Sequence, residues 1–207
     1  TLIETMGLGC ESEAYDPMEK AMLRFCEEHQ ISTEKLFSGR FVSEYAFTNE
    51  LKMMGHVWQR DGKLIIAAKG SAERILTICE LTDEQRKEAE EKIDSLSSEG
   101  LRVIAIAAGY PQTENEVPAS ITDCRLTLLG LVGLADPPRE SVKNDIAVCT
   151  KAGIRVVMIT GDNGITASAT AKKVGMPNSD HIVTGDMLEK MTDAELREAV
   201  KDVSIFS

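Results

Sequence analysis

The stretch MMGHVWQRDGKLIIAA, residues 53–68, decides the fold of the first part of the chain. Two apolar runs, Met53–Arg60 and Lys63–Ala68, stand on either side of Asp61-Gly62. An Asp-Gly pair between such runs favours a type I′ turn, in which both central residues take positive φ angles. The stretch therefore predicts an antiparallel hairpin.

Patterns on both sides of the hairpin predict further elements of the same domain. Residues 41–47 alternate like a strand, and residues 101–108 form an apolar strand. An N-cap aspartate followed by proline begins a helix over residues 16–29, and a capping box begins a charged helix over residues 82–100. Residues 1–125 are therefore expected to form an α+β domain, with an antiparallel sheet flanked by helices.

From residue 126 the pattern changes to strands that alternate with helices. Such alternation predicts a parallel sheet covered by helices, so we expect a second, α/β domain over residues 126–207. Its predicted elements are a strand at Leu126–Leu134, a helix at Pro138–Lys151, a strand at Ile154–Ile159, a helix at Gly164–Val174, a short strand at His181–Val183 and a helix capped by Thr192.

Composition excludes several classes of protein. The 207 residues carry a net charge of −11, which repels nucleic acid, so no nucleic-acid partner is expected. The five cysteines form no CxxC pair and are expected to be reduced. The three histidines are scattered, so no metal site is predicted. No apolar stretch approaches the roughly 18–20 residues that span a bilayer.

Two segments follow predicted strands at the edge where open sheets bind ligands. Thr160-Gly161-Asp162 joins a strand to a helix N-terminus, whose free N–H groups and dipole suit a phosphate. Asp136-Pro137-Pro138-Arg139 also joins a strand to a helix and is expected to lie on the same edge. The alternative for each segment is an ordinary capped turn with no ligand. The chain has no Walker A sequence and no GxGxxG sequence after a strand.

A third group of candidates lies in the first part of the chain. Phe47 and Lys52 lie on or beside one strand, Lys69-Gly70 ends another, and Arg102 begins a third. An aromatic ring and three cations would suit an adenine base and its phosphates. The alternative is a core phenylalanine and three solvated cations.

These segments together resemble the cytoplasmic region of P-type ATPases, close to the type II cation pumps that include calcium pumps. The resemblance covers nearly the whole chain and rests on six motifs in the family's order: Asp16-Pro17-Met18-Glu19, Phe47-Thr48-Asn49-Glu50-Leu51-Lys52, Lys69-Gly70-Ser71-Ala72-Glu73, Gly100-Leu101-Arg102, Asp136-Pro137-Pro138-Arg139 and Thr160-Gly161-Asp162.

The resemblance implies a nucleotide-binding domain over residues 1–125 and part of a haloacid-dehalogenase-like phosphorylation domain over residues 126–207. It also implies a role for each candidate. Phe47 would stack on adenine, Glu19, Lys52, Lys69 and Gly70 would line its pocket, and Arg102 would contact phosphate. Asp136 and Arg139 would lie near the ribose and phosphates, and Thr160, Gly161 and Asp162 would contact the transferring phosphoryl group.

The sequence departs from the family's pattern at two places within these motifs. Many relatives have arginine where this chain has Asn49, which puts phosphate binding at that position in doubt. Ser71-Ala72 replaces Ala-Pro, which relaxes a turn but keeps Lys69 and Gly70.

The family's Asp-Lys-Thr-Gly-Thr, which contains the phosphorylated aspartate, and its magnesium-binding Gly-Asp-Gly-x-Asn-Asp do not occur in these residues. We therefore expect a fragment that binds ATP without turnover, with Mg²⁺ needed only in the full-length enzyme. Its partners would be the transmembrane helices, the actuator domain and the rest of the phosphorylation domain, at the cytoplasmic face of a membrane. Without the central strand that carries the aspartate in the family, Ile154–Ile159 would have an exposed edge, which predicts self-association or local disorder after about residue 126.

Two alternatives remain at the level of the sequence. One is a stand-alone soluble protein that binds a nucleotide or a partner and transports nothing. The other is a haloacid-dehalogenase-like phosphatase, which is disfavoured because no Asp-x-Asp occurs in the chain.

Overall fold

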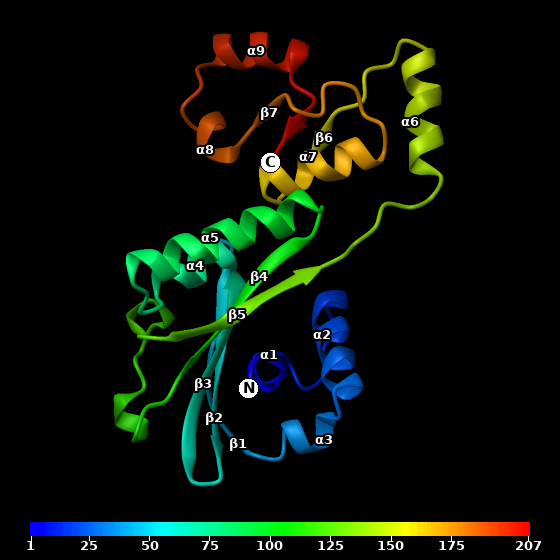
Figure 1. The fold of residues 1–207 in the computed structure, drawn as a ribbon. Helices are drawn as coiled ribbons and strands as arrows, with labels where there is room; N and C mark the ends of the chain where they lie inside the picture. The colour runs from blue at the N-terminus through cyan, green and yellow to red at the C-terminus, as the bar shows by residue number, and fades with distance from the viewer. The chain divides into compact units, whose positions relative to one another are not determined.

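The Asp61-Gly62 turn joins two central strands of a five-stranded sheet. In a computed structural model of residues 1–207, β2 (Met53–Arg60) and β3 (Lys63–Ser71) pair antiparallel (Figure 1). Asp61 has φ 49° and Gly62 has φ 75°, the two positive values that a type I′ turn requires. The predicted hairpin is therefore confirmed.

The sheet has the strand order β1-β2-β3-β4-β5, with β1 at Arg40–Tyr45, β4 at Arg102–Gly109 and β5 at Thr127–Leu134. Strand β1 pairs antiparallel with β2, and β3 pairs antiparallel with β4. Across β2 and β3, Met54 lies opposite Lys69 and His56 lies opposite Ala67. Because strand side chains alternate between faces, Met54, His56 and Lys69 share one face of the sheet.

Three N-terminal helices cover that face of the sheet: α1 (Leu2–Leu8), α2 (Pro17–Glu28) and α3 (Thr33–Leu36) (Figure 1). Trp58 Nε1 donates to the Leu8 carbonyl at 2.9 Å, which fixes the end of α1 to β2. Leu8, Leu36, Trp58 and Ala67 form the buried core between the helices and the strands. Helix α2 begins as predicted, since Asp16 Oδ1 accepts from the Met18 N–H at 2.7 Å.

The remaining helices of the first part lie between β3 and β5. Helix α4 covers Ala72–Thr77, and α5 covers Asp83–Ser98. The predicted capping box of α5 is confirmed, because the Gln85 N–H donates to Thr82 Oγ1 at 3.2 Å and the Thr82 N–H donates to Gln85 Oε1 at 3.0 Å. Two short 3₁₀ turns, Glu114–Glu116 and Ile121–Asp123, precede β5.

A second, smaller sheet is parallel, as predicted. Strand β8 lies between β6 and β7 and pairs parallel with both. Helix α7 packs on it through Ala167 and Ala171, which are buried against Ile205. The elements are α6 (Val142–Lys151), β6 (Met158–Ile159), α7 (Gly164–Lys173), β7 (Ile182–Val183), α8 (Gly185–Leu188), α9 (Asp193–Asp202) and β8 (Ile205–Phe206).

The chain divides into two compact units, one of residues 1–90 with 103–132 and the other of residues 91–102 with 133–207. The short segment 91–102 belongs to the second unit because it is bonded to α7: Thr166 Oγ1 donates to the Leu101 carbonyl at 3.0 Å, and Lys173 Nζ donates to the Glu99 carbonyl. None of the helices has both the length and the apolar character needed to cross a membrane.

The strand after residue 126 was assigned to the wrong sheet. The sequence placed it in the parallel sheet, but β5 is a strand of the five-stranded sheet. Its start is bonded to the segment that follows α4, where the Leu126 N–H donates to the Ile78 carbonyl at 3.0 Å and the Glu80 N–H donates to the Leu126 carbonyl at 2.9 Å. Leu126 itself is 1% exposed, so burial of its side chain holds β5 in this sheet.

Two further boundaries differ from the prediction. Helix α6 begins at Val142 rather than at Pro138. The Val142 N–H donates to the Arg139 carbonyl at 3.0 Å, so a turn over residues 139–142 precedes the helix. The predicted strand at 154–159 shortens to Met158–Ile159, since its partner β8 is itself two residues long.

Candidate functional site

A buried ion pair lies on the face of the first sheet that the helices cover. Lys69 Nζ, from β3, donates to a carboxylate oxygen of Glu19, from α2. Lys69 is 3% exposed and Glu19 is 6% exposed. Either charge alone would be costly to bury, so each depends on the other. The Glu11 N–H also donates to Glu19 Oε2 at 3.2 Å, which gives the carboxylate a second partner.

Cys10 completes the surroundings of the Lys69 ammonium. Lys69 Nζ lies 3.4 Å from Cys10 Sγ, and the thiol donates to the Met6 carbonyl at 3.3 Å. Burial raises the pKa of the Cys10 thiol to about 11, although the neighbouring Lys69 charge acts in the opposite direction. The thiol is therefore neutral at physiological pH, and it packs here instead of acting as a nucleophile.

Gly70 allows the backbones of β2 and β3 to approach closely beside this pair. A Cβ atom on Gly70 would lie 2.5 Å from Met53 Cβ and 2.6 Å from the Lys52 carbonyl oxygen. The Ser71 N–H donates to that same carbonyl at 2.9 Å. Lys52 itself is exposed and has φ 53° at the end of a turn closed by its N–H to the Thr48 carbonyl at 2.8 Å. The structure thus brings Lys52 and Gly70 together.

Phe47 lies in the turn between β1 and β2, and 54% of it is exposed. The alternative of a core phenylalanine is therefore wrong. The alternative of a solvated cation is also wrong for Lys69, whereas Lys52 and Arg102 are both exposed. The geometry joins Lys69 to Glu19 and Lys52 to Gly70, but no hydrogen bond or ion pair links Phe47 or Arg102 to either pair.

In the second unit, Thr160-Gly161-Asp162 forms the predicted turn between β6 and α7. The Asp162 N–H donates to Thr160 Oγ1 at 3.1 Å, and the Thr160 N–H donates to the Phe206 carbonyl at 3.0 Å. Asn163 caps α7 by accepting from the Ile165 N–H at 2.8 Å. A Cβ on Gly161 would meet no atom within 4 Å, so the space beside this turn is open.

Asp136 and Arg139 are both exposed, on the irregular segment between β5 and α6. The expectation that they share a sheet edge with Thr160 rested on β5 and β6 belonging to one sheet. That premise is wrong, because β5 lies in the five-stranded sheet and β6 in the three-stranded one. No hydrogen bond or ion pair joins the two segments.

Comparison with known proteins identifies the family. Residues 11–141 match the family model described as "P-type ATPase, cytoplasmic domain N". This chain belongs to the P-type ATPase family. The match includes Glu19, Phe47, Lys52, Lys69, Gly70, Arg102, Asp136 and Arg139, whereas Thr160, Gly161 and Asp162 lie outside it.

Individual P-type ATPases are similar to nearly the whole chain. Calcium-transporting ATPase 1 of Lactococcus lactis subsp. lactis (strain IL1403) is 34% identical over 93% of this chain and 23% of its own length. The calcium-transporting ATPase of Bacillus subtilis (strain 168) has the same values, 34%, 93% and 23%. A sodium/potassium exporting P-type ATPase of Schizosaccharomyces pombe (strain 972 / ATCC 24843) is 32% identical over 87% of this chain and 20% of its own length. The chain thus spans about a fifth of the length of these P-type ATPases.

Sequence reasoning missed two residues of this P-type ATPase that contact the Lys69–Glu19 pair. Cys10 and Glu11 lie in the segment between α1 and α2, far from Lys69 along the chain. No motif marks them, and only the packing of α1 against β3 brings them to the pair. Glu11 has a second set of neighbours, Glu44 and His56, for which sequence spacing gave no signal because the three lie on separate elements.

Proposed function

We propose that this chain binds ATP and serves as the nucleotide-binding part of a cation-transporting P-type ATPase. The observation that carries this proposal is the match to the cytoplasmic N domain over residues 11–141, which contains eight of the candidate site residues. Phe47 would stack on the adenine ring, and Lys52 would line the pocket. Arg102, Asp136 and Arg139 would contact the phosphates and ribose.

The buried pair fits such a ligand. The Lys69 ammonium carries three N–H donors, and Nζ contacts Glu19 and Cys10. One donor is therefore left for an acceptor such as an adenine nitrogen. The exposed Phe47 ring offers a face on which a base can stack, since every base has an aromatic face.

Replacing Phe47 by alanine tests the stacking contact. Base stacking on an aromatic ring is worth about 1–3 kcal/mol, so the affinity for ATP should fall by roughly 5- to 150-fold. Isothermal titration calorimetry is the suitable measurement, because Trp58 is buried against Leu8 and is a poor fluorescent reporter. Phe25→Ala removes another exposed phenylalanine, on α2, and serves as the control. Equal ATP affinity in Phe47→Ala and the unchanged chain would remove Phe47 from the site.

The chain is further proposed to bind ATP without hydrolysing it. Its residues include neither the phosphorylated aspartate motif nor the magnesium-binding motif of the family, and phosphoryl transfer depends on such groups for positioning and charge stabilisation. With Mg·ATP we expect phosphate release no faster than in a sample without protein, and no acid-stable phosphoenzyme. Label from γ-phosphate on the chain would contradict this.

Thr160, Gly161 and Asp162 are proposed to contact the transferring phosphoryl group in the whole pump. The open space beside Gly161 and the adjacent N-terminus of α7 support this role. Inorganic phosphate should shift the amide NMR signals of Gly161 and Asp162, and Thr160→Ala should reduce that shift. The rest of the phosphorylation domain, the actuator domain and the transmembrane helices would be the partners, at the cytoplasmic face of a membrane, where ATP hydrolysis would require Mg²⁺.

A further inference from the structure

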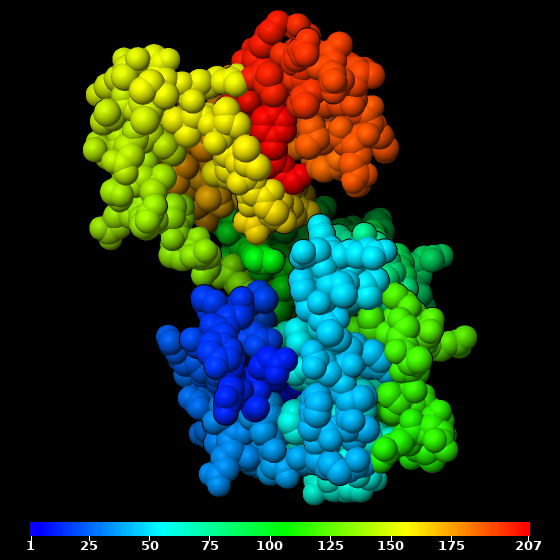
Figure 2. Space-filling view, turned by 180° about the vertical axis from the view of Figure 1, so that it is seen from behind, coloured from blue at the N-terminus to red at the C-terminus, as the bar shows by residue number.

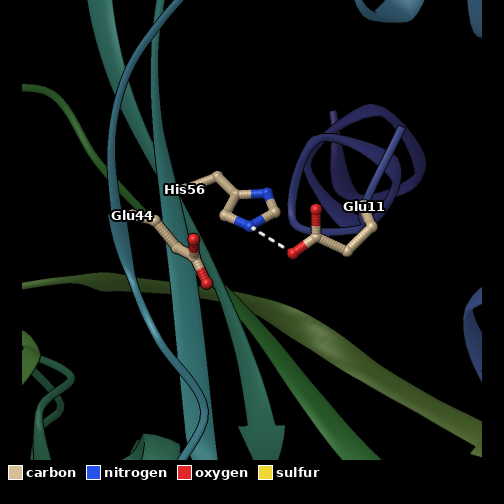
Figure 3. A group of neighbouring side chains, drawn as sticks. All are labelled: Glu11, Glu44 and His56. Atoms are coloured by element: carbon tan, nitrogen blue, oxygen red, sulfur yellow. Dashed lines mark ion pairs between the residues drawn. The ribbon is translucent and has the colours of Figure 1, made fainter. Parts of the chain in front are cut away.

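A group of three potential metal ligands lies at the edge of the covered sheet face, and the proposed nucleotide site does not use them. His56 comes from β2, Glu44 from β1 and Glu11 from the segment after α1 (Figure 3). One ligand atom from each lies within 4.8 Å of the other two. In Figure 3 both carboxylates turn toward the imidazole, and Glu11 Oε1 is 3.5 Å from His56 Nε2.

The partner of Nδ1 shows where one ring hydrogen of His56 lies. His56 Nδ1 lies 3.1 Å from the Leu8 carbonyl oxygen. A carbonyl oxygen can only accept a hydrogen bond, so Nδ1 carries the hydrogen. A neutral ring then leaves a lone pair on Nε2, which faces the two carboxylates. A backbone carbonyl that holds Nδ1–H in this way is the arrangement that orients metal-binding histidines in proteins.

The burial of His56 makes this arrangement costly unless a cation is present. The residue is 2% exposed, and its Nε2 atom has no hydrogen-bond partner. A buried acceptor without a partner costs roughly 1–3 kcal/mol. The two carboxylates repel each other, and the nitrogen lone pair beside them is a further acceptor. The group therefore lacks a positive charge at its centre.

We infer that Glu11, Glu44 and His56 bind one divalent transition-metal ion of the Zn²⁺ type. Imidazole with carboxylates is a ligand set suited to such ions. Ligand atoms about 2.0–2.1 Å from a tetrahedral zinc ion lie roughly 3.3 Å apart, close to the 3.5 Å already present between Glu11 and His56. Glu44 and Glu11 are exposed, so their flexible side chains can close the remaining gap and water can complete the coordination.

The positions of these three residues in the fold support one shared site. Glu44 and His56 are direct cross-strand partners in the β1–β2 register, so their side chains project from the same face. Figure 2 shows dark-blue N-terminal residues beside lighter-blue and cyan residues of the first unit at the surface, and both glutamates of the group are exposed. The ion would tie the α1–α2 connection to the sheet, independently of whether ATP binds.

Titration of the 207-residue chain with Co²⁺ and Zn²⁺, in the absence of nucleotide, tests the inference. We expect one Co²⁺ ion to bind and to give the visible absorption bands of tetrahedral, four-coordinate cobalt. Zn²⁺ should displace the Co²⁺ and remove these bands. In ¹⁵N-histidine NMR, Zn²⁺ should shift Nε2 of His56 strongly and leave Nδ1 protonated. A sulfur-to-cobalt charge-transfer band would instead show that the cysteines bind the metal, and it would overturn the inference.

Substitutions separate this site from other carboxylates and histidines. Glu11→Gln, Glu44→Gln and His56→Gln should each weaken metal binding by at least about tenfold, since the loss of even an outer-shell partner typically costs 10- to 100-fold. Glu13→Gln and His29→Gln, two exposed side chains outside the group, should bind as the unchanged chain does. If His56→Gln fails to fold, the two exposed glutamate variants decide the question. Unchanged affinity in both of them, or an Nε2 of His56 that carries a hydrogen with Zn²⁺ present, would overturn the inference.

Discussion

Lys69 and Glu19 carry opposite charges into the interior of the first unit, where only the pairing makes their burial tolerable. Lys69 lies on β3 and Glu19 on α2, so the pair also fixes where that helix sits on the strand. The same two residues line the proposed adenine pocket. Any substitution there therefore changes stability as well as binding, and the two effects have to be measured separately.

Lys69→Met leaves the Glu19 carboxylate buried with only the Glu11 N–H as a partner. Removing one partner of a buried ion pair typically costs about 3–5 kcal/mol, so we expect the free energy of unfolding in urea to fall by about that amount. Lys52→Met, which removes an exposed lysine of the proposed pocket, should change the free energy of unfolding by no more than about 0.5 kcal/mol.

A double substitution checks the cause of that loss. Lys69→Met combined with Glu19→Leu removes both buried charges, and an apolar pair of similar volume is often as stable as the ion pair. The double variant should therefore regain at least half of the lost stability. A double variant less stable than Lys69→Met alone would show that the pair is not the reason for the loss.

Among the secondary-structure elements, the β2–β3 hairpin contains a close backbone contact that only glycine permits. Lys52, Met53 and Gly70 approach so closely that no Cβ fits at residue 70. This contact sets the spacing between the turn that carries Phe47 and the strand that carries Lys69. The hairpin therefore positions both proposed ends of the adenine pocket.

Gly70→Ala should force the two strands apart. Its Cβ would meet backbone and Cβ atoms at 2.5–2.6 Å, which cannot move as a side-chain tip could. Overpacking of this kind costs about 1–3 kcal/mol, and thermal unfolding of the variant would reveal it as a lower midpoint. The matched control is Gly161→Ala, since nothing lies within 4 Å of a Cβ at that position. Equal midpoints for the two variants would contradict the proposed close contact.

The sequence predicted the elements with strong local signals and failed where tertiary contacts decide. The Asp61-Gly62 turn and the caps at Asp16, Thr82 and Thr192 were all predicted, because the hydrogen bonds that form them are local. Strand β5 was assigned to the wrong sheet. Leu126 bonds to Ile78 and Glu80, which are distant in sequence, and no sequence pattern marks the pairing of β5 with β4. Strand β8 was not predicted, since two residues carry no periodicity.

The candidate site was predicted in its parts but not in its geometry. Motif resemblance gave Lys69 and Glu19, and the structure joins them. That Lys69 is buried could not be read from the sequence, because a single lysine at a strand end is usually solvated. Cys10, Glu11 and the His56 group depend on how α1 packs against β2 and β3, which no local pattern encodes.

At the scale of the whole molecule, the second sheet presents an edge strand to its surroundings. Strand β6 has one neighbour, β8, and Ile159 on that edge is 82% exposed. Exposed edges with large apolar side chains pair with other chains. Self-association thus stays a prediction, with a defined surface to test.

Ile159→Lys should weaken self-association, because natural sheet edges use lysine to prevent such pairing. Sedimentation velocity over a range of concentrations should show the unchanged chain associating at lower concentration than the variant. Val148→Lys, on the exposed surface of α6, tests for a general effect of added charge. A chain that stays monomeric at every concentration would refute the prediction.

The central strand of the small sheet is also the last element of these residues to be made. Strands β6 and β7 touch β8 and not each other, so neither can pair before residues 205–206 arrive. The β6–β8 contact closes a loop of nearly fifty residues, and such long-range contacts form slowly. During synthesis the strands of the first sheet are complete at Leu134, so that sheet can fold before β8 has been synthesised.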